Sequence, residues 1–206
     1  NLVISDTEFL KTLPKREIVC GYGEILKHSI IGDRKFYNFL NKNKHKILKL
    51  TSPFLEKAIY ESCKIKKTVV EKDEKEKGLR KVLNFGHSFA HAYEATLGFS
   101  KKLNHGEAVI LGMKTALNFS LKIKLMHKSD YYSIIEHIDN SNLPSSISKF
   151  FSTKDTKKIL NFMAKDKKNR SSDINLVLLK KIGAPIINKE YSKKKIGLFL
   201  KIFLRN

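Results

Sequence analysis

Most of the chain places apolar residues three and four positions apart, which is the spacing of amphipathic α-helices. Ser52 and Pro53 resemble an N-cap and a first-turn proline at the start of one long helix. We expect helices at 14–31, 33–43, 52–71, 86–97, 105–126, 129–138, 145–150, 154–164 and 192–204. The pattern therefore predicts a mainly α fold.

Three segments depart from the helical pattern. Residues 174–187 are rich in β-branched side chains and contain a glycine and a proline, so they predict one or two short strands with a turn. Residues 1–14 predict a strand followed by a short helix, and the charged run EKDEKEKGLRK at 71–81 predicts a loop. The 206 residues suffice for one sizeable domain or at most two small ones.

A formal net charge of +21 raises the hypothesis of a nucleic-acid partner, because clustered cations bind phosphate backbones. However, the cations are mostly lysines spread along the whole chain. Arginine, the residue preferred for bidentate recognition of bases and phosphates, occurs at five positions: 16, 34, 80, 170 and 205. We therefore expect solvated lysine-rich faces and no nucleic-acid partner.

The two cysteines and the absence of long apolar runs bear on location. Cys20 and Cys63 have no CxxC spacing and form no small secreted framework, so reduced thiols in the cytoplasm are the simplest interpretation. No apolar run reaches the roughly 18 residues that a membrane-spanning helix needs, so we expect no membrane span.

Three of the seven histidines fall within LNFGHSFAHAYEATLGFSKKLNHGEAV at 83–109. On a helix, His87 and His91 project from one face a turn apart, and Glu94 continues the same stripe. Two imidazoles so placed can bind one metal ion together, or one can bind while the other transfers protons. The stretch lacks the HExxH pattern of metalloproteases.

A third imidazole, His105, shifts the balance from a structural role toward a metal site. It begins another predicted helix, and Gly86 and Gly106 beside the histidines allow the close backbone approach that a buried polar site needs. A carboxylate would complete a His2Glu shell with an open position. The residue types alone leave that ligand open among Glu24, Glu94 and Glu107.

Polar residues beside apolar stretches suggest what the metal site would act on. They are Lys66, Arg80, Asn84 and the run DKKNR at 166–170. Lysine and arginine supply positive charge and asparagine supplies neutral donors, so together they suit an anionic, polyhydroxylated substrate.

The ordered motifs of the chain resemble the C-terminal helical domain of the 3-dehydroquinate synthase family, and the resemblance covers almost the whole chain. The motifs are TLPKREIVCGYGEILKHSIIGD (12–33), SCKIKKTVVEKDEKEKGLRKVLNFGHSFAHAYEA (62–95), LNHGEAVILGM (103–113), and DKKNR (166–170) with LVLLKKIG (176–183). The resemblance implies a Zn2+ or Co2+ ion held by Glu24, His87 and His105. It also implies that Glu76 and His91 are the acid–base residues. The substrate-binding residues that it implies are Lys27, Lys66, Arg80, Asn84 and either Lys167 or Lys168, with a weak preference for Lys168.

The family's reaction, which the resemblance implies, converts 3-deoxy-D-arabino-heptulosonate 7-phosphate into 3-dehydroquinate and phosphate on the route to chorismate and the aromatic amino acids. NAD+ serves as a catalytic cofactor that is regenerated in each turnover. The family's N-terminal Rossmann-like NAD domain and its glycine-rich loop are not found in this sequence, so we expect a piece of a longer chain that has little activity alone. The resemblance also suggests a homodimer. Sugar-phosphate cyclases of the same superfamily remain the alternative enzyme class.

Overall fold

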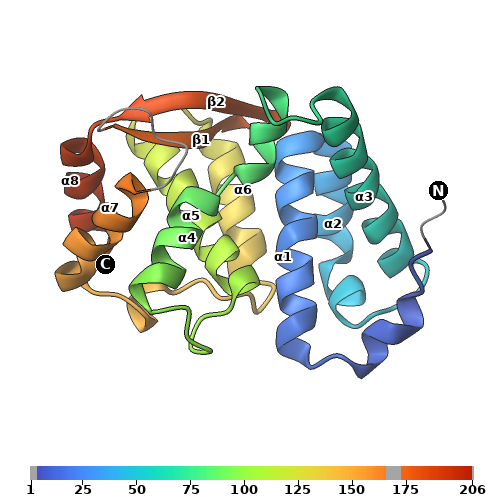
Figure 1. Ribbon diagram of the computed structural model, residues 1–206. Helices are drawn as coiled ribbons and strands as arrows, with labels where there is room; N and C mark the ends of the chain where they lie inside the picture. The colour runs from blue at the N-terminus through green and yellow to red at the C-terminus, as the bar shows by residue number, and fades with distance from the viewer. Residues whose placement is uncertain (1–3, 166–172, 206) are drawn as a thin grey trace.

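The structure, a computed structural model, describes residues 4–165 and 173–205. Within these residues eight α-helices pack with one antiparallel β-hairpin that lies along one side of them, so the predicted mainly α fold is confirmed (Figure 1). The helices are α1 (Lys15–Gly32), α2 (Arg34–Leu48), α3 (Phe54–Lys72), α4 (His87–Thr96), α5 (His105–Lys122), α6 (Lys128–Asp139), α7 (Thr156–Ala164) and α8 (Lys193–Phe203). The strands are β1 (Ile174–Lys181) and β2 (Ala184–Tyr191).

Four local predictions need correction. Residues 4–6 form no strand and lead directly into a 3-10 helix, Thr7–Thr12, that the Asp6 side chain caps. Pro53 itself occupies the N-cap position of α3, so Ser52 does not cap that helix. Helix α2 continues to Leu48 because its apolar face extends through the buried Ile47. The segment expected at 145–150 forms only the 3-10 turn Ile147–Lys149.

Helix α5 is the centre of the core. Twelve of its 18 residues are buried, around most of the helix, because it packs against α1, α4, α6 and strand β1. Its start is fixed by a capping box: the Asn104 side chain accepts from the Glu107 amide, and the Glu107 carboxylate accepts from the Asn104 amide. The N-terminal residue of α5 is thus held at a defined place on the surface of the core.

Glycines let α5 approach its two neighbouring helices closely. A Cβ atom at Gly106 would lie 2.3 Å from Cβ of Cys20 on α1. A Cβ atom at Gly112 would lie 2.2 Å from the carbonyl oxygen of Gly86, the residue with a φ of 81° just before α4. No other residue type fits at these contacts, so the glycines set the spacing of α1, α5 and α4. The expected close approach at Gly86 and Gly106 is confirmed.

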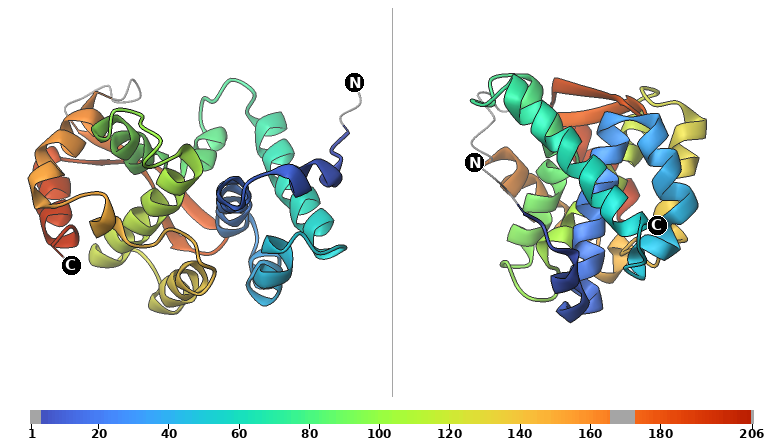
Figure 2. Two further views of the ribbon diagram at one scale, coloured as in Figure 1. Left: turned by 90° about the horizontal axis from the view of Figure 1, so that it is seen from below. Right: turned by 90° about the vertical axis from the view of Figure 1, so that its right-hand side faces the viewer.

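Helix α1 lies between two groups of helices. Figure 2 shows it nearly end-on, with α2 and α3 on one side and α4 and α5 on the other. The hairpin runs above α4 and α5, and its turn is anchored to the end of α1 because the Gly183 amide donates to the Ile30 carbonyl at 2.8 Å (Figure 1). The middle of α1 therefore faces the beginnings of α4 and α5.

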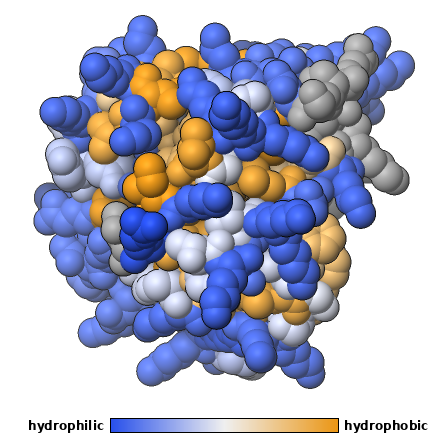
Figure 3. All heavy atoms as spheres, turned by 90° about the vertical axis from the view of Figure 1, so that its left-hand side faces the viewer, coloured by the Kyte–Doolittle hydropathy of each residue, from blue (hydrophilic) through white to orange (hydrophobic). Residues whose placement is uncertain are grey.

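The face formed by α7 and α8 carries scattered apolar surface. Leu198 and Ile202 of α8 are more than half exposed, and hydrophilic side chains interrupt the apolar patches (Figure 3). Five lysines line a groove between the two helices: 154, 157, 193, 194 and 201. None of the helices in the described ranges combines the length and the apolar character needed to cross a bilayer.

The contact between α4 and α5 can be tested with Gly112→Ala. The new methyl group would collide with backbone atoms of Gly86 and Ala90, at 2.2 and 2.9 Å, which cannot move independently of their helix. We expect the free energy of unfolding, measured by urea denaturation, to fall by about 1–3 kcal/mol. Gly21→Ala is the control, because nothing lies within 4 Å of its Cβ position in α1. There we expect a gain of roughly 0.5–1 kcal/mol from helix propensity; equal losses in both variants would contradict the packing argument.

Candidate metal centre

Three side chains from three helices converge at one point. Glu24 lies in the middle of α1, whereas His87 and His105 are the first residues of α4 and α5. One potential ligand atom from each lies within 4.8 Å of the other two. The centroids of the two imidazole rings are 5.5 Å apart. The close helix approaches at Gly106 and Gly112 bring these distant residues together.

His87 is prepared to act as a neutral ligand. Its Nδ1 atom lies 3.3 Å from the Phe85 carbonyl oxygen, so Nδ1 carries the proton that is donated there. The other nitrogen, Nε2, keeps its lone pair and lies 4.0 Å from Oε1 of Glu24. Burial, together with the nearby charge of Lys27, lowers the pKa of His87 to about 4. The ring is therefore neutral at neutral pH, as metal binding requires.

Glu24 presents a buried oxygen that lacks a partner. Its Oε2 atom accepts a hydrogen bond from Lys27 Nζ at 2.7 Å, but no donor in the described part of the chain reaches the buried Oε1 atom. Burial alone would raise the pKa of Glu24, but the neighbouring Lys27, followed by His87 and His28, outweighs burial, so the pKa lies below its usual value. A carboxylate oxygen without a donor beside a free imidazole nitrogen fits a divalent cation such as zinc.

His105 is hydrogen-bonded to the carboxylate of Glu94. Its Nδ1 atom lies 3.2 and 3.3 Å from the two carboxylate oxygens of Glu94. Glu94 thus contacts Nδ1 of the potential ligand His105 and leaves Nε2 of that ring available. Glu107, the third carboxylate considered from the sequence, takes part in the capping box and an ion pair with Arg16. Of the three carboxylates that the residue types left open, Glu24 alone belongs to the convergent group.

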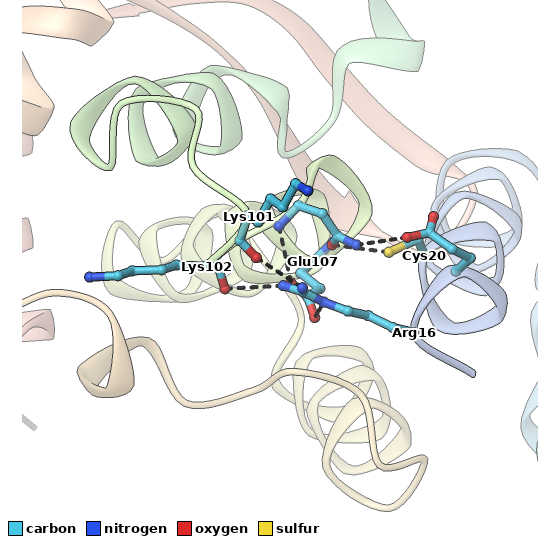
Figure 4. A network of polar contacts seen from close by, with 7 residues as sticks. Arg16, Cys20, Lys101, Lys102 and Glu107 are labelled. Carbon is cyan, nitrogen blue, oxygen red and sulfur yellow. Dashed lines mark hydrogen bonds and ion pairs between the residues drawn. The ribbon is translucent and has the colours of Figure 1, made fainter. Parts of the chain in front are cut away.

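Arg16 fastens the start of α5 to α1. Its guanidinium donates to both oxygens of Glu107, at 2.8 and 2.5 Å, and to the carbonyl oxygens of Lys101 and Lys102, at 2.9 and 3.1 Å (Figure 4). On the same side, Cys20 of α1 donates from Sγ to the Asn104 side chain at 3.1 Å. These bonds hold the loop before His105 against the helix that carries Glu24.

His91 lies one turn along α4 from His87. Its ring centroid is 5.4 Å from that of His87 and 6.2 Å from that of His105, and the residue is exposed. On its other side it lines an open pocket of about 310 Å³ together with Ser88, Phe99 and Lys165. The position is suited to exchanging protons with solvent or a bound molecule, because the ring is accessible and close to the convergent group.

The charged loop before α4 places Glu76 against Asn84. The Asn84 side chain donates to Oε1 of Glu76 at 2.7 Å. The loop is organised by Asp73, whose carboxylate accepts from three backbone amides, those of residues 77, 78 and 80, at 2.8–2.9 Å. These hydrogen bonds lower the pKa of Asp73, and the bond from the Arg80 amide has the largest effect. Glu76 adopts a φ of 52°, a left-handed conformation that is uncommon for such a residue.

The predicted substrate-binding cations occupy different environments. Lys27 is only 3% exposed; burial lowers its pKa, and its bond to Glu24 partly compensates. Lys66 of α3 is exposed, and its positive charge also contributes to lowering the pKa of Lys27. Arg80 donates from Nη1 to the Glu74 carbonyl oxygen at 2.7 Å. Lys167 and Lys168 lie outside the described residues.

The sequence interpretation missed the groups that support the ligands. The Arg16–Glu107 ion pair joins residues 91 positions apart, and such a distant pairing leaves little trace in a sequence. The role of Asp73 was also missed, because it lies within a charged run in which no single carboxylate stands out. The capping box, by contrast, had a readable signal. Asn104 followed three residues later by Glu107, ahead of an apolar run, is a typical helix start.

Two further histidines are buried as neutral core residues. His137 accepts at Nε2 from the Tyr22 hydroxyl at 2.9 Å and donates from Nδ1 to Asn41 at 3.0 Å. Burial, followed by the nearby charge of Lys44, lowers its pKa to about 3. His28 is bonded to Ser62 at 2.7 Å, and burial followed by the Lys27 charge lowers its pKa to about 4.

Comparison with known proteins identifies the family. Residues 21–169 match the family model described as 3-dehydroquinate synthase C-terminal, a span that includes all three convergent residues. The chain belongs to this family. The 3-dehydroquinate synthase of Pelagibacter ubique is 61% identical to it over 201 residues, which make up 98% of this chain and 55% of that protein. The chain spans about half the length of the curated relatives it matches.

Solved structures share the family's fold. A 2-epi-5-epi-valiolone synthase from Streptomyces hygroscopicus, solved with NAD+ and Zn2+ bound, superposes with a TM-score of 0.83 at 20% identity, over 97% of this chain and 54% of that one. A 2-deoxy-scyllo-inosose synthase, solved with carbaglucose-6-phosphate, NAD+ and Co2+, gives 0.81 at 22% identity, over 96% and 55%. The likeness confirms the predicted fold class, a helical domain of the dehydroquinate synthase type with a short β element.

The Arg16 contacts can be tested with Arg16→Ala. Without the guanidinium, the loop before His105 loses its bonds to α1, so we expect a loss of roughly 1–2 kcal/mol in the free energy of unfolding. We also expect severalfold weaker zinc binding, measured by titration of the chain. Lys11→Ala is the control, because its ion pair with Glu8 is exposed on both sides; it should change neither quantity appreciably. Equal zinc affinities in all three proteins would contradict the proposed support of His105.

The buried histidines predict a pH-dependent stability. Because the folded pKa of His137 is about 3, below the ordinary value of 6.5, its contribution to stability is complete above pH 6.5 and is lost as the pH falls toward 3. Below pH 6.5 the slope approaches about 1.4 kcal/mol per pH unit for this residue. We expect His137→Gln to reduce the change in the urea-unfolding free energy between pH 7.5 and 5.5 by about 1.4 kcal/mol. An unchanged pH dependence would show that His137 is not the buried neutral group inferred here.

Proposed function

We propose that this chain is the metal- and substrate-binding domain of a 3-dehydroquinate synthase. The conversion would be that of 3-deoxy-D-arabino-heptulosonate 7-phosphate into 3-dehydroquinate and phosphate. The observation that carries the proposal is the convergence of Glu24, His87 and His105 within the span that matches the family. The relative from Pelagibacter ubique, at 61% identity, supports the choice of substrate over that of the sugar-phosphate cyclases.

Glu24, His87 and His105 would hold the metal ion. When bound, Zn2+ or Co2+ would polarise the substrate hydroxyl that is oxidised, and NAD+ would accept the hydride and later return it. Glu24 and the two neutral imidazoles form a ligand set with one negative charge, which leaves most of the ion's charge available to the substrate. Structural neighbours solved with NAD+ and either Zn2+ or Co2+ support this choice of cofactors.

The cations around the metal ligands would bind the substrate's anionic groups. Arg80 would take the carboxylate, since guanidinium groups bind carboxylates with two parallel hydrogen bonds. Lys27 and Lys66 would bind hydroxyl oxygens. Asn84 would contribute an amide donor to the phosphate, along with Lys168 or Lys167. Such an arrangement favours a substrate that carries both a carboxylate and a phosphate.

Glu76 and His91 would handle protons. His91 is exposed beside both histidine ligands, so it can take or give a proton at the substrate and exchange it with water. Glu76 is oriented by the Asn84 amide at 2.7 Å, on a loop held by Asp73. Two titratable groups on different elements allow proton removal and delivery at different atoms of one substrate.

The remaining parts of the assembly are inferred from the family. The curated relatives are about twice the length of this chain, so an NAD-binding N-terminal domain would complete the active site. We further infer a cytoplasmic homodimer that acts in chorismate and aromatic amino-acid biosynthesis. The chain alone should show little or no turnover, because it would lack most contacts to NAD+.

A chimera tests this function. This chain would replace the matching part of the Pelagibacter ubique synthase, and phosphate release and 3-dehydroquinate formation would be measured with the heptulosonate phosphate and with sedoheptulose 7-phosphate. We expect turnover of the heptulosonate phosphate by the chimera and none by the 206-residue chain alone. Turnover of sedoheptulose 7-phosphate alone would overturn the assignment in favour of a cyclase.

Variants of the chimera test the individual roles. Glu24→Gln, His87→Ala and His105→Ala should each lower kcat/KM by at least about 1000-fold and reduce bound zinc. His91→Ala should lower kcat by about 100-fold or more while zinc content stays unchanged, since proton transfer contributes on that order. Asp139→Asn, which removes an exposed partner of Lys114, serves as the control. Zinc retained at full occupancy in the three ligand variants would refute the metal assignment.

A further inference from the structure

The contact between Glu94 and His105 joins two helices beside the proposed metal site. Both Glu94 oxygens lie within 3.3 Å of Nδ1 of His105, and the Glu94 side chain is only 13% exposed. An ionised carboxylate can only accept hydrogen bonds. In the neutral form of the ring, the His105 proton must therefore sit on Nδ1 for the contact to be favourable, and Nε2 is left with its lone pair.

The orientation of the His105 ring depends more on its contact with Glu94 than the orientation of the His87 ring depends on its contact with the Phe85 carbonyl. The His87 side chain is 14% exposed, and the Phe85 carbonyl holds its Nδ1 atom. The His105 side chain is 53% exposed, so little packing restrains its ring. Among the described residues, Glu94 is the hydrogen-bond partner of that ring. An exposed imidazole otherwise samples both tautomers and several orientations.

We propose that Glu94 is a positioning residue that keeps His105 in the Nδ1–H tautomer, with Nε2 free to bind a divalent metal ion together with Glu24 and His87. The inference rests on the metal site under Proposed function and adds the group that prepares its most exposed ligand. A carboxylate that accepts from a metal-bound imidazole also raises the basicity of the ligand and typically contributes 10- to 100-fold to metal affinity.

The position of Glu94 on α4 supports this role. His87, His91 and Glu94 are spaced by four and three residues, so they form one stripe along the helix. One helix thereby supplies a ligand, a proton carrier and the group that orients the ligand on α5. The stripe faces the start of α5 because the contact between Gly86 and Gly112 sets how α4 lies against it.

The ring tautomers can be measured without any metal, by long-range ¹H–¹⁵N spectra of the metal-free chain at a pH where the imidazoles are neutral. In the wild type we expect His105 as the Nδ1–H tautomer. Glu94→Leu should redistribute it toward the Nε2–H form, whereas Glu94→Gln keeps an acceptor oxygen and should largely retain Nδ1–H. The ring signals of His87 and His137 report whether the fold is intact. If Glu94→Leu does not fold, Glu94→Asp, which withdraws the carboxylate by one methylene, should give the same redistribution.

Cobalt binding supplies the second measurement. We expect Glu94→Leu to bind Co2+ about 10- to 100-fold more weakly, with an altered d–d absorption spectrum, and Glu94→Gln to recover most of the affinity. Asp139→Asn is the matched control, because it removes a carboxylate that contacts α5 away from the histidines.

The two measurements separate the inference from the proposed function. An unchanged His105 tautomer in Glu94→Leu, or unchanged cobalt affinity and spectrum, would overturn the role of Glu94. A tautomer that depends on Glu94 in a chain that binds no cobalt would leave the orienting contact standing and refute the metal site instead.

Discussion

The close approach of α5 to α1 and α4 is the constraint on which the proposed site depends. Gly106 and Gly112 remove the side chains that would separate the helices, at contacts where a Cβ atom would lie 2.2–2.3 Å from its neighbours. This spacing brings residues 24, 87 and 105 together, although two of them begin helices and one lies within a third. The packing energy of the buried α5 face stabilises this spacing, so the core maintains the geometry of a polar site.

Electrostatic balance is the second requirement. A buried anionic oxygen is costly unless it is paired, and Lys27 pairs only one of the two oxygens of the partly buried Glu24. The charges and bonds around the site leave one anionic oxygen and one neutral imidazole nitrogen facing the same space. A divalent cation, as proposed for this site, would satisfy both at once.

The sequence predicted much of this arrangement, and the limits have physical causes. Helical periodicity located most helices, because burial of one face imposes it, and the glycines beside His87 and His105 correctly indicated close approach. The periodicity alone did not choose among Glu24, Glu94 and Glu107, since a carboxylate's role depends on which helix lies opposite. The resemblance to a family identified Glu24 as the carboxylate ligand. The structure showed that Glu94 contacts His105 and that Glu107 pairs with Arg16. The contacts of Arg16 were not predicted because its partners lie 85 to 91 residues away in the sequence.

The single stripe of His87, His91 and Glu94 on α4 has a mechanical consequence. A rigid helix transmits any rotation or shift to all three side chains together, so a movement of α4 that displaced the proposed ligand His87 would also displace His91 and Glu94. A sliding or turning α4 would therefore disturb the proposed ligand, the proposed proton carrier and the proposed orienting group at the same time.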